Sequence, residues 1–305
     1  MTATETVAPP DSRTSPLHIT GSLFAALRPR QWTKNVLVLA APFAAGELGS
    51  VPVLTQSAVA FLAFALAASG IYLVNDIRDR EADRQHPVKR DRPIAAGRVP
   101  VWLAATTAVV LLCAALGTAA WVALPLVGVL AVYEAVQLAY CFGLKHQPVI
   151  EMGIVASGFL LRAIAGGAAT GIALSHWFLL VSGFGSLFVV AGKRYAEVVL
   201  VADTGREVRR VLDAYTHSYL RFVWITAASV MMSSYALWAF DIHEVSDSRL
   251  SVLSVVPFVL AVFCYGLDVD RGRAGAPEDA ILVDRTLQVL GLLWVGCLGA
   301  ALYLH

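Results

Sequence analysis

The stretch Asn75-Asp76-Ile77-Arg78-Asp79-Arg80-Glu81-Ala82-Asp83 follows an uncharged run of about twenty residues, Val53 to Val74. An apolar run of this length that ends abruptly in carboxylates and guanidinium groups is typical of a membrane helix that reaches water. Asn75, Asp79 and Asp83 are spaced four residues apart, so on a continuing helix their side chains lie along one face. The stretch therefore predicts a membrane-spanning helix with a row of oxygen donors at its water-exposed end.

This row of oxygen donors favours a bound cation, because neighbouring carboxylates repel each other unless positive charge lies between them. Mg²⁺ is commonly held by one or two carboxylates, with water and substrate phosphate completing its shell. The basic run that follows, with Lys89, Arg90 and Arg92, is suited to phosphate oxygens. The alternative is an ordinary solvated helix end, in which Asp76 and Arg80 form an i,i+4 ion pair. We favour the first interpretation because metal and cations together are what a diphosphate needs.

The composition places the chain in the membrane. Of its 305 residues 58% are hydrophobic and only 15% are charged, and the mean hydropathy is +0.68. The four cysteines have no C-x-x-C spacing, which argues against both disulfides and a thiolate metal site. Residues 1–20 are rich in Thr, Ser and Pro and lack the pattern of a signal peptide. We expect them to form a disordered cytoplasmic tail, followed by one catalytic domain over 21–305.

Nine membrane spans are predicted from the apolar segments, so the expected fold is an all-α integral membrane protein. Two segments are about twice as long as a bilayer requires and should each form two helices, with turns near Gly117–Trp121 and Gly171–Trp177. The expected spans are Leu23–Gly46, Val53–Val74, two within Val101–Phe142, two within Val149–Gly192, Phe222–Phe240, Leu250–Leu267 and Leu287–Leu304.

Lys and Arg set the orientation. With the N-terminus inside and the C-terminus outside, 21 of the 23 Lys and Arg residues lie on the cytoplasmic side. The other two are Arg249, on the outer side, and Arg162, within a span. Two long connections, 75–98 and 193–221, then face the cytoplasm, and both interleave cations with carboxylates. Their charge density predicts a site on this face, although basic loops also bind anionic lipid.

Arg162 is the strongest polar signal inside a span. An arginine that faces lipid costs several kcal/mol, so its side chain should face the bundle interior or a wet cavity. Two explanations remain open, a role at the active cavity or a structural ion pair with Glu151 or Glu134.

Other common functional motifs are absent from the sequence. It contains no Walker sequence, no G-x-G-x-x-G in a strand context, no H-E-x-x-H and no pattern of a Ser/His/Asp triad. A channel or carrier would place its polar residues near the bilayer midplane, whereas most of them gather here on one face. No nucleic-acid partner is expected.

Two blocks of the sequence, the first of which contains the row, resemble the UbiA-type intramembrane prenyltransferase superfamily. The first block is Asn75-x-x-x-Asp79-x-x-x-Asp83 followed by His86-Pro87-x-Lys89-Arg90-x-Arg92-Pro93-Ile94-Ala95-Ala96-Gly97. The second is Gly158-x-x-x-Arg162-Ala163-x-x-Gly166. The resemblance implies a nine-helix bundle around a central cavity that opens to the cytoplasm. It also implies Mg²⁺ held between two Asp-rich motifs.

The second of those motifs departs from the usual pattern. Where aromatic prenyltransferases carry a second aspartate cluster, this chain reads Gly192-Lys193-Arg194-Tyr195-Ala196-Glu197, with one well-placed carboxylate behind two cations. Together with Arg28-Pro29-Arg30-Gln31-Trp32-Thr33-Lys34-Asn35, this is similar to one subfamily, the phosphoribosyltransferases of actinobacterial cell-wall synthesis. More cations and fewer carboxylates suit a donor and an acceptor that both carry additional phosphate groups.

The resemblance implies transfer of 5-phosphoribose from phosphoribosyl diphosphate (PRPP) to a polyprenyl phosphate such as decaprenyl phosphate, for arabinogalactan precursors. Diphosphate would be released, and the enzyme would be Mg²⁺-dependent and lie in the plasma membrane with its site facing the cytoplasm. The alternative enzyme is a UbiA-type aromatic prenyltransferase of a quinone or haem pathway, which uses a prenyl diphosphate. A non-catalytic lipid carrier or channel is the third reading, and the sequence leaves open whether the chain forms a homo-oligomer.

Site residues are carried over from the resemblance position by position. The expected catalytic residues are Asn75, Asp79 and Asp83. These three are also expected to bind the metal, together with Glu197 or, in its place, Asp203. The expected substrate-binding residues are Lys34, Asn35, Lys89, Arg90, Arg92, Arg162, Lys193, Arg194 and Tyr195.

Overall fold

A computed structural model describes residues 16–204, 210–246, 248–272 and 283–304. Within these ranges the chain is helical and contains no strand. Eight helical segments are long and apolar enough to cross a membrane, so the chain is a multi-pass membrane protein. They are α3 (Val51–Arg78), α5 (Val101–Val122), α6 (Leu124–Cys141), α7 (Ile150–Thr170), α8 (His176–Thr204), α9 (His217–Ser246), α10 with α11 (Arg249–Leu253, Val255–Asp270) and α13 (Arg285–Tyr303).

The segment expected as the first of nine spans is broken into three short pieces. These are α1 (Pro16–Ala26), the 3₁₀ helix η2 (Pro29–Leu39) and α2 (Ala40–Ala44). The break falls at Arg28, whose φ of 56° is left-handed, because the following Pro29 disfavours an α conformation before it. Nine spans and the N-in/C-out orientation therefore stay predictions. Helix α1 also begins inside the stretch expected to be a disordered tail.

The broken segment packs inside the bundle, against α3 and α7. Gly166 of α7 permits this packing, because a Cβ atom there would lie 2.0 Å from the carbonyl oxygen of Val38 in η2. Any other residue at this position would push η2 away from α7. The close approach brings the predicted N-terminal site residues beside the predicted Arg162 block.

The two long apolar segments divide close to where the sequence predicts. One break is at Ala123, two residues beyond the expected Gly117–Trp121 turn, where the backbone is extended before Pro125 in the first turn of α6. The other is at Gly171, within the expected range, where a φ of 72° ends α7 in the manner of a glycine C-cap.

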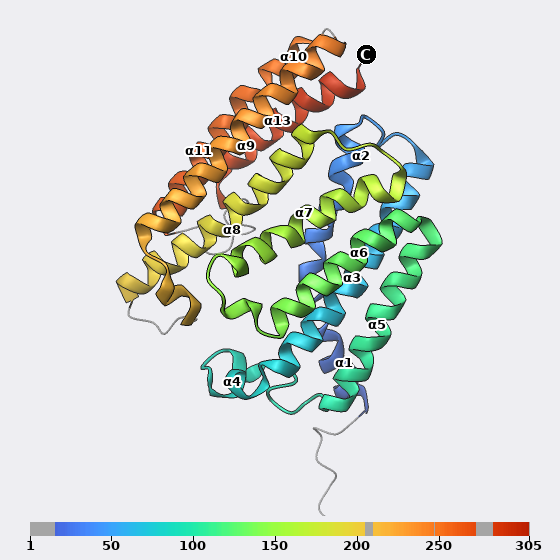
Figure 1. Cartoon of the computed structure of the whole chain (residues 1–305), viewed down its shortest axis with the longest axis vertical. Coiled ribbons are helices and arrows are strands. Elements are labelled where there is room, and N and C mark those ends of the chain that lie inside the picture. The colour runs from blue at the N-terminus through green and yellow to red at the C-terminus, as the bar shows by residue number, and fades with distance from the viewer. Residues whose placement is uncertain (1–15, 205–209, 247, 273–282, 305) are drawn as a thin grey trace, which may run out of the picture.

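The helices form two groups, each with its own apolar core (Figure 1). One core joins α3, α5, α6 and α7, and the other joins the start of α7 with α8, α9, α11 and α13. Helix α3 is the central element of the first group, since 61% of the residues in its apolar 18-residue stretch are buried. The corresponding share for the peripheral α13 is 17%. Side chains of the peripheral helices are left to face lipid.

Three connections come together at one end of the bundle. Lys145, in the short 3₁₀ helix η4 (Leu144–His146) between α6 and α7, pairs with Asp79 at the end of α3. The η4 turn also contacts η5 (Arg210–Ala214), which precedes α9. The segment 193–221, expected as a loop, is helical through Thr204 because α8 continues beyond its apolar part.

Candidate functional site

The row of Asn75, Asp79 and Asp83 persists although α3 stops at Arg78. Asp79 has a φ of −90° and a ψ of 0° and lies between α3 and α4 (Arg80–Gln85). The backbone N–H of Asp79 still donates to the Asn75 carbonyl at 2.9 Å, and that of Asp83 donates to the Asp79 carbonyl at 2.7 Å. Because each step keeps the i→i−4 hydrogen bond of a helix, the three side chains stay in register on one stripe.

Cations already lie on this stripe. Lys145 pairs with Asp79, and Arg92 pairs with Asp83 at 2.7 Å. Arg92 also reaches the buried Asp76 at 3.2 Å, and Arg28 pairs with the same Asp76 oxygen at 2.5 Å. Asp76 is therefore held by two arginines that come from before and after α3, and these are its ion-pair partners instead of Arg80, the partner considered for a plain helix end.

Lys145 is a candidate site residue that the sequence did not single out. Its side chain is 14% exposed and comes from η4, far from Asp79 in sequence. Its one available signal was that it is the single Lys or Arg between the α6 and α7 spans, on the face predicted to be cytoplasmic. Pairing across the bundle depends on how α6 and α3 pack, which hydropathy does not reveal.

The donor set of the stripe suits a hard cation. Two carboxylates and the half-buried Asn75 amide offer only oxygen ligands, the kind that Mg²⁺ prefers. One carboxylate oxygen of Asp79 pairs with Lys145, and one of Asp83 pairs with Arg92. The second oxygen of each carboxylate accepts no hydrogen bond within the described residues. The same residues contain no cluster of three or more His, Cys, Asp or Glu side chains arranged for a metal. A metal here would therefore depend on water and substrate oxygens.

Glu197, expected as the fourth metal ligand, is paired instead with Arg194 in the same helix, at 2.9 Å. Arg194 in turn grips the buried Glu151 with two hydrogen bonds, from Nε to Oε1 at 2.9 Å and from Nη2 to Oε2 at 2.8 Å. Arg194 thus bridges α7 and α8. The side chain of Asp203, the alternative ligand, lies outside the described part of the chain.

Arg162 faces the bundle interior, as its charge requires, and both proposed glutamate partners are replaced by neutral groups. Its Nε donates to Asn35 at 2.7 Å, Nη1 to the Gly158 carbonyl at 2.6 Å and Nη2 to the Tyr133 hydroxyl at 3.1 Å. Its guanidinium also lies over the rings of Phe64 and Tyr133, at 5.5 and 5.0 Å. Among the described residues, no carboxylate pairs with this buried cation.

The remaining predicted residues lie in η2, in η3 and on α8. Lys34 projects from η2, with its ammonium 5.7 Å from the ring centre of Phe159. Lys89 and Arg90 lie in the 3₁₀ helix η3 (Lys89–Asp91), and the His86 ring accepts the backbone N–H of Lys89 at 3.3 Å.

The second block on α8 is split between two environments. Lys193 is half-buried, next to Arg194. Tyr195 points to another side of α8, where its hydroxyl donates to Asp270 at 3.2 Å. The structure therefore gathers the stripe with Arg92 and Lys145, joins Asn35 to Arg162, and gives Tyr195 a separate neighbourhood.

Burial raises the pKa of the Tyr215 phenol above its ordinary value. Its oxygen accepts the Val149 backbone N–H at 2.6 Å. This hydrogen bond ties the start of α9 to the start of α7, so the phenol stays protonated and in place at neutral pH.

Comparison with solved structures identifies the fold. A UbiA homologue from Archaeoglobus fulgidus bound to DMAPP and Mg²⁺ matches with a TM-score of 0.67 and 16% sequence identity, over 92% of this chain and 99% of that one. At this identity the likeness establishes the fold, a UbiA-type helical bundle.

Comparison at the level of sequence is much closer. The decaprenyl-phosphate phosphoribosyltransferase of Mycobacterium tuberculosis is 55% identical over 94% of this chain and 96% of its own length. The protein of the same name from Corynebacterium glutamicum is 50% identical over 96% of this chain and 90% of its own length. The UbiA prenyltransferase family itself matches residues 36–282, which include the stripe, the Arg162 block and the α8 block. This chain belongs to the UbiA prenyltransferase family.

Proposed function

We propose that this protein transfers 5-phosphoribose from PRPP to a polyprenyl phosphate, with decaprenyl phosphate as the expected acceptor, and releases diphosphate. The observation that carries the proposal is the identity of 50–55% over nearly the whole chain to relatives named decaprenyl-phosphate phosphoribosyltransferase. The product would serve as a precursor of arabinan-containing cell-wall polymers. The enzyme would lie in the plasma membrane with its stripe on the cytoplasmic face, because a water-soluble donor meets a lipid acceptor there.

The charges of the site support this chemistry. The stripe offers carboxylate oxygens beside Arg92 and Lys145, so cations and metal-binding groups alternate over a short distance. A diphosphate with a metal needs both kinds of group, cations for its oxygens and carboxylates for the metal. Lys89, Arg90 and Lys193 add positive charge for the 5-phosphate of the donor and the phosphate of the lipid.

In the proposed reaction the protein positions two anionic substrates. When bound by Asn75, Asp79 and Asp83, Mg²⁺ would neutralise the diphosphate and make it a better leaving group. Arg92 and Lys145, already beside those carboxylates, would bind diphosphate oxygens as negative charge grows on them. The lipid phosphate attacks C1 of the ribose from the face opposite the diphosphate, so the C1–O bond to diphosphate breaks as the new one forms, with inversion.

No general base is needed for this step, because the phosphate nucleophile is already ionised at neutral pH. Most of the rate would come from orientation and from preorganised charge. Arg162 would hold its neighbours Asn35 and Tyr133 in place. Its charge, unpaired with any carboxylate in the described residues, would add a positive potential inside the bundle.

The test is donor choice. Purified protein in detergent is given either PRPP with decaprenyl phosphate or a prenyl diphosphate with an aromatic acid, with and without Mg²⁺, and diphosphate release is measured. Release with the first pair, dependent on Mg²⁺, is the expected result. Release with the second pair alone would make the protein an aromatic prenyltransferase, and release with neither would favour a carrier or channel.

A further inference from the structure

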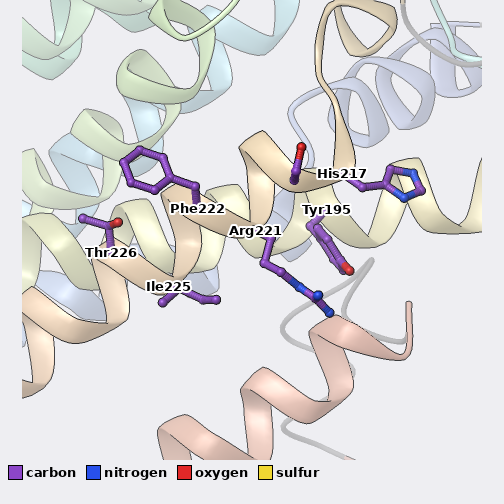
Figure 2. A pocket seen from close by; sticks show the side chains of 7 residues that line it. Tyr195, His217, Arg221, Phe222, Ile225 and Thr226 are labelled. Atoms are coloured by element: carbon purple, nitrogen blue, oxygen red, sulfur yellow. The ribbon is translucent and has the colours of Figure 1, made fainter.

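A pocket of about 480 Å³ lies at the side of the bundle, and no residue of the stripe lines it. Tyr195 lines it from α8, and the other lining residues come from the first three turns of α9 (Figure 2). They are His217, Ser218, Arg221, Phe222, Ile225 and Thr226. Their spacing of three and four residues places them on one face of α9.

The lining changes from polar to apolar along α9. His217, Ser218 and Arg221 form the polar end, and the exposed Phe222 and Ile225 follow, with Thr226 as one polar side chain beyond them (Figure 2). Phe222 is 65% exposed, which in a membrane protein indicates a lipid-facing position. A ligand that fits this gradient has a polar head at the start of α9 and an apolar chain that runs into the membrane.

Two accessible and opposite charges lie at the polar end: Arg221 lines the pocket, and its ion-pair partner Asp270 lies beside the lining residues. Arg221 pairs with Asp270 of α11 at 2.5 Å, and the two side chains remain 52% and 44% exposed. The Tyr195 hydroxyl donates to the same Asp270 oxygen at 3.2 Å. The Arg221 guanidinium lies 5.9 Å from the ring centre of Tyr195, and Figure 2 shows these two side chains next to each other. The pair carries no net charge, so it is matched by a headgroup that also has one charge of each sign.

This pocket lies at the same end of the bundle as the stripe. Lys145 of η4 binds Asp79, η4 contacts η5, and η5 leads through Tyr215 into His217. The head of a bound lipid would therefore lie in the membrane leaflet on the side of the proposed reaction.

We propose that this pocket binds a phospholipid whose headgroup carries a phosphate and a primary ammonium group, that is, phosphatidylethanolamine. Arg221 and the first turn of α9 bind the phosphate, since backbone N–H groups at a helix start favour an anion. Asp270 binds the ammonium group. One acyl chain runs along Phe222 and Ile225. A purely anionic headgroup would compete with Asp270 for Arg221 and would bring no cation to replace it beside the carboxylate. This site is separate from the proposed reaction and does not depend on it.

Two substitutions test the proposal, and they are expected to differ in their effect on phosphatidylglycerol. Purified protein is exchanged into nanodiscs that contain phosphatidylcholine with either phosphatidylethanolamine or phosphatidylglycerol, and retained lipid is counted by native mass spectrometry after release. Arg221→Met removes the phosphate partner and should reduce retained phosphatidylethanolamine about tenfold or more. Asp270→Asn should reduce it similarly but increase retained phosphatidylglycerol, because Arg221 is then an unpaired cation.

The matched control is Arg271→Met, which removes an exposed positive charge one residue beyond Asp270 and should leave both lipids unchanged. Melting curves check that each variant is folded. The proposal is overturned if wild type retains no lipid, if it retains the two lipids equally, or if Asp270→Asn leaves the preference as it was. It is also overturned if decaprenyl phosphate displaces the retained phosphatidylethanolamine, since the pocket would then belong to the acceptor.

Discussion

Arg194 of α8 grips Glu151 of α7 with a two-pronged pair of hydrogen bonds, at 2.9 and 2.8 Å, and both side chains are buried. A third contact joins Arg194 to Glu197, so its guanidinium already lies between two carboxylates. A parallel two-bond contact of this kind fixes orientation as well as distance. The pair therefore determines how α8 sits against α7, next to the neighbouring Lys193. Contact of Arg194 with substrate stays a prediction.

The first prediction concerns this pair. Glu151→Gln should lower the free energy of unfolding by about 3–5 kcal/mol, because it leaves a buried guanidinium without its main counter-ion. Arg194→Met should destabilise the protein similarly, by leaving Glu151 unpaired. The measurement is thermal unfolding in detergent, followed by intrinsic tryptophan fluorescence.

The matched control is Lys193→Met, the neighbouring cation, which makes no ion pair among the described residues. It should unfold like wild type and instead raise the apparent KM for PRPP by roughly tenfold. The double variant Glu151→Leu with Arg194→Met should recover much of the lost stability, since both buried charges are gone. Additive losses in the double variant would contradict the proposed coupling.

The second prediction concerns the stripe. Asp79→Asn and Asp83→Asn keep the size of the side chain but remove its charge, so turnover should fall by about a hundredfold or more while folding survives. Glu81→Gln is the control, because Glu81 is exposed and pairs only with Arg84 among the described residues. Turnover of PRPP and decaprenyl phosphate is measured over a range of Mg²⁺ concentrations. Near-normal turnover in folded Asp79→Asn would return the stripe to an ordinary solvated helix end.

The third prediction concerns Lys145, which only the tertiary structure places beside Asp79. Lys145→Met should reduce kcat/KM for PRPP by roughly tenfold or more, because a charge-assisted contact to the diphosphate is lost. Lys145→Arg keeps the positive charge and should retain more activity. The exposed His146 in the same turn provides the control, and His146→Ala should behave like wild type. Equal activity of Lys145→Met and wild type would remove Lys145 from the site.

The fourth prediction concerns the buried Arg162. Tyr133→Phe removes one of its three hydrogen bonds and should cost about 0.5–1.5 kcal/mol of stability. Arg162→Met should cost more, because the Asn35 side chain and the Gly158 carbonyl lose their buried donor as well. Thermal unfolding measures both. A variant Arg162→Met as stable as wild type would show that the cation is held for substrate alone.

The fifth prediction concerns orientation, which rests on the distribution of Lys and Arg. On a background in which the four native cysteines are replaced by alanine, Arg90→Cys should react with a membrane-impermeant maleimide only from the cytoplasmic side. Arg249 is exposed at the start of α10, at the end of the bundle away from α4 (Figure 1), so Arg249→Cys should react only from outside. Labelling of both variants from the same side would overturn the proposed placement of the site.

Sequence alone determined the membrane class, the helix pattern and the stripe. Eight of the nine expected spans correspond to long helices, because about twenty apolar residues can satisfy their backbone groups in lipid only as a helix. The stripe followed from the spacing of Asn75, Asp79 and Asp83, since a helical register depends only on neighbouring residues. Such features are local, and a local pattern is visible along the chain.

Tertiary structure alone decided which groups meet. Lys145 pairs with Asp79, and Arg194 pairs with Glu151. Arg162 donates hydrogen bonds to Asn35 and Tyr133, where the sequence had suggested Glu151 or Glu134 as its partner. Each of these pairs joins residues far apart in the chain, so it depends on how helices rotate and cross. How each helix is rotated depends on close packing at small residues, such as Gly166 against Val38. Such packing produces no periodic pattern that can be seen in the sequence.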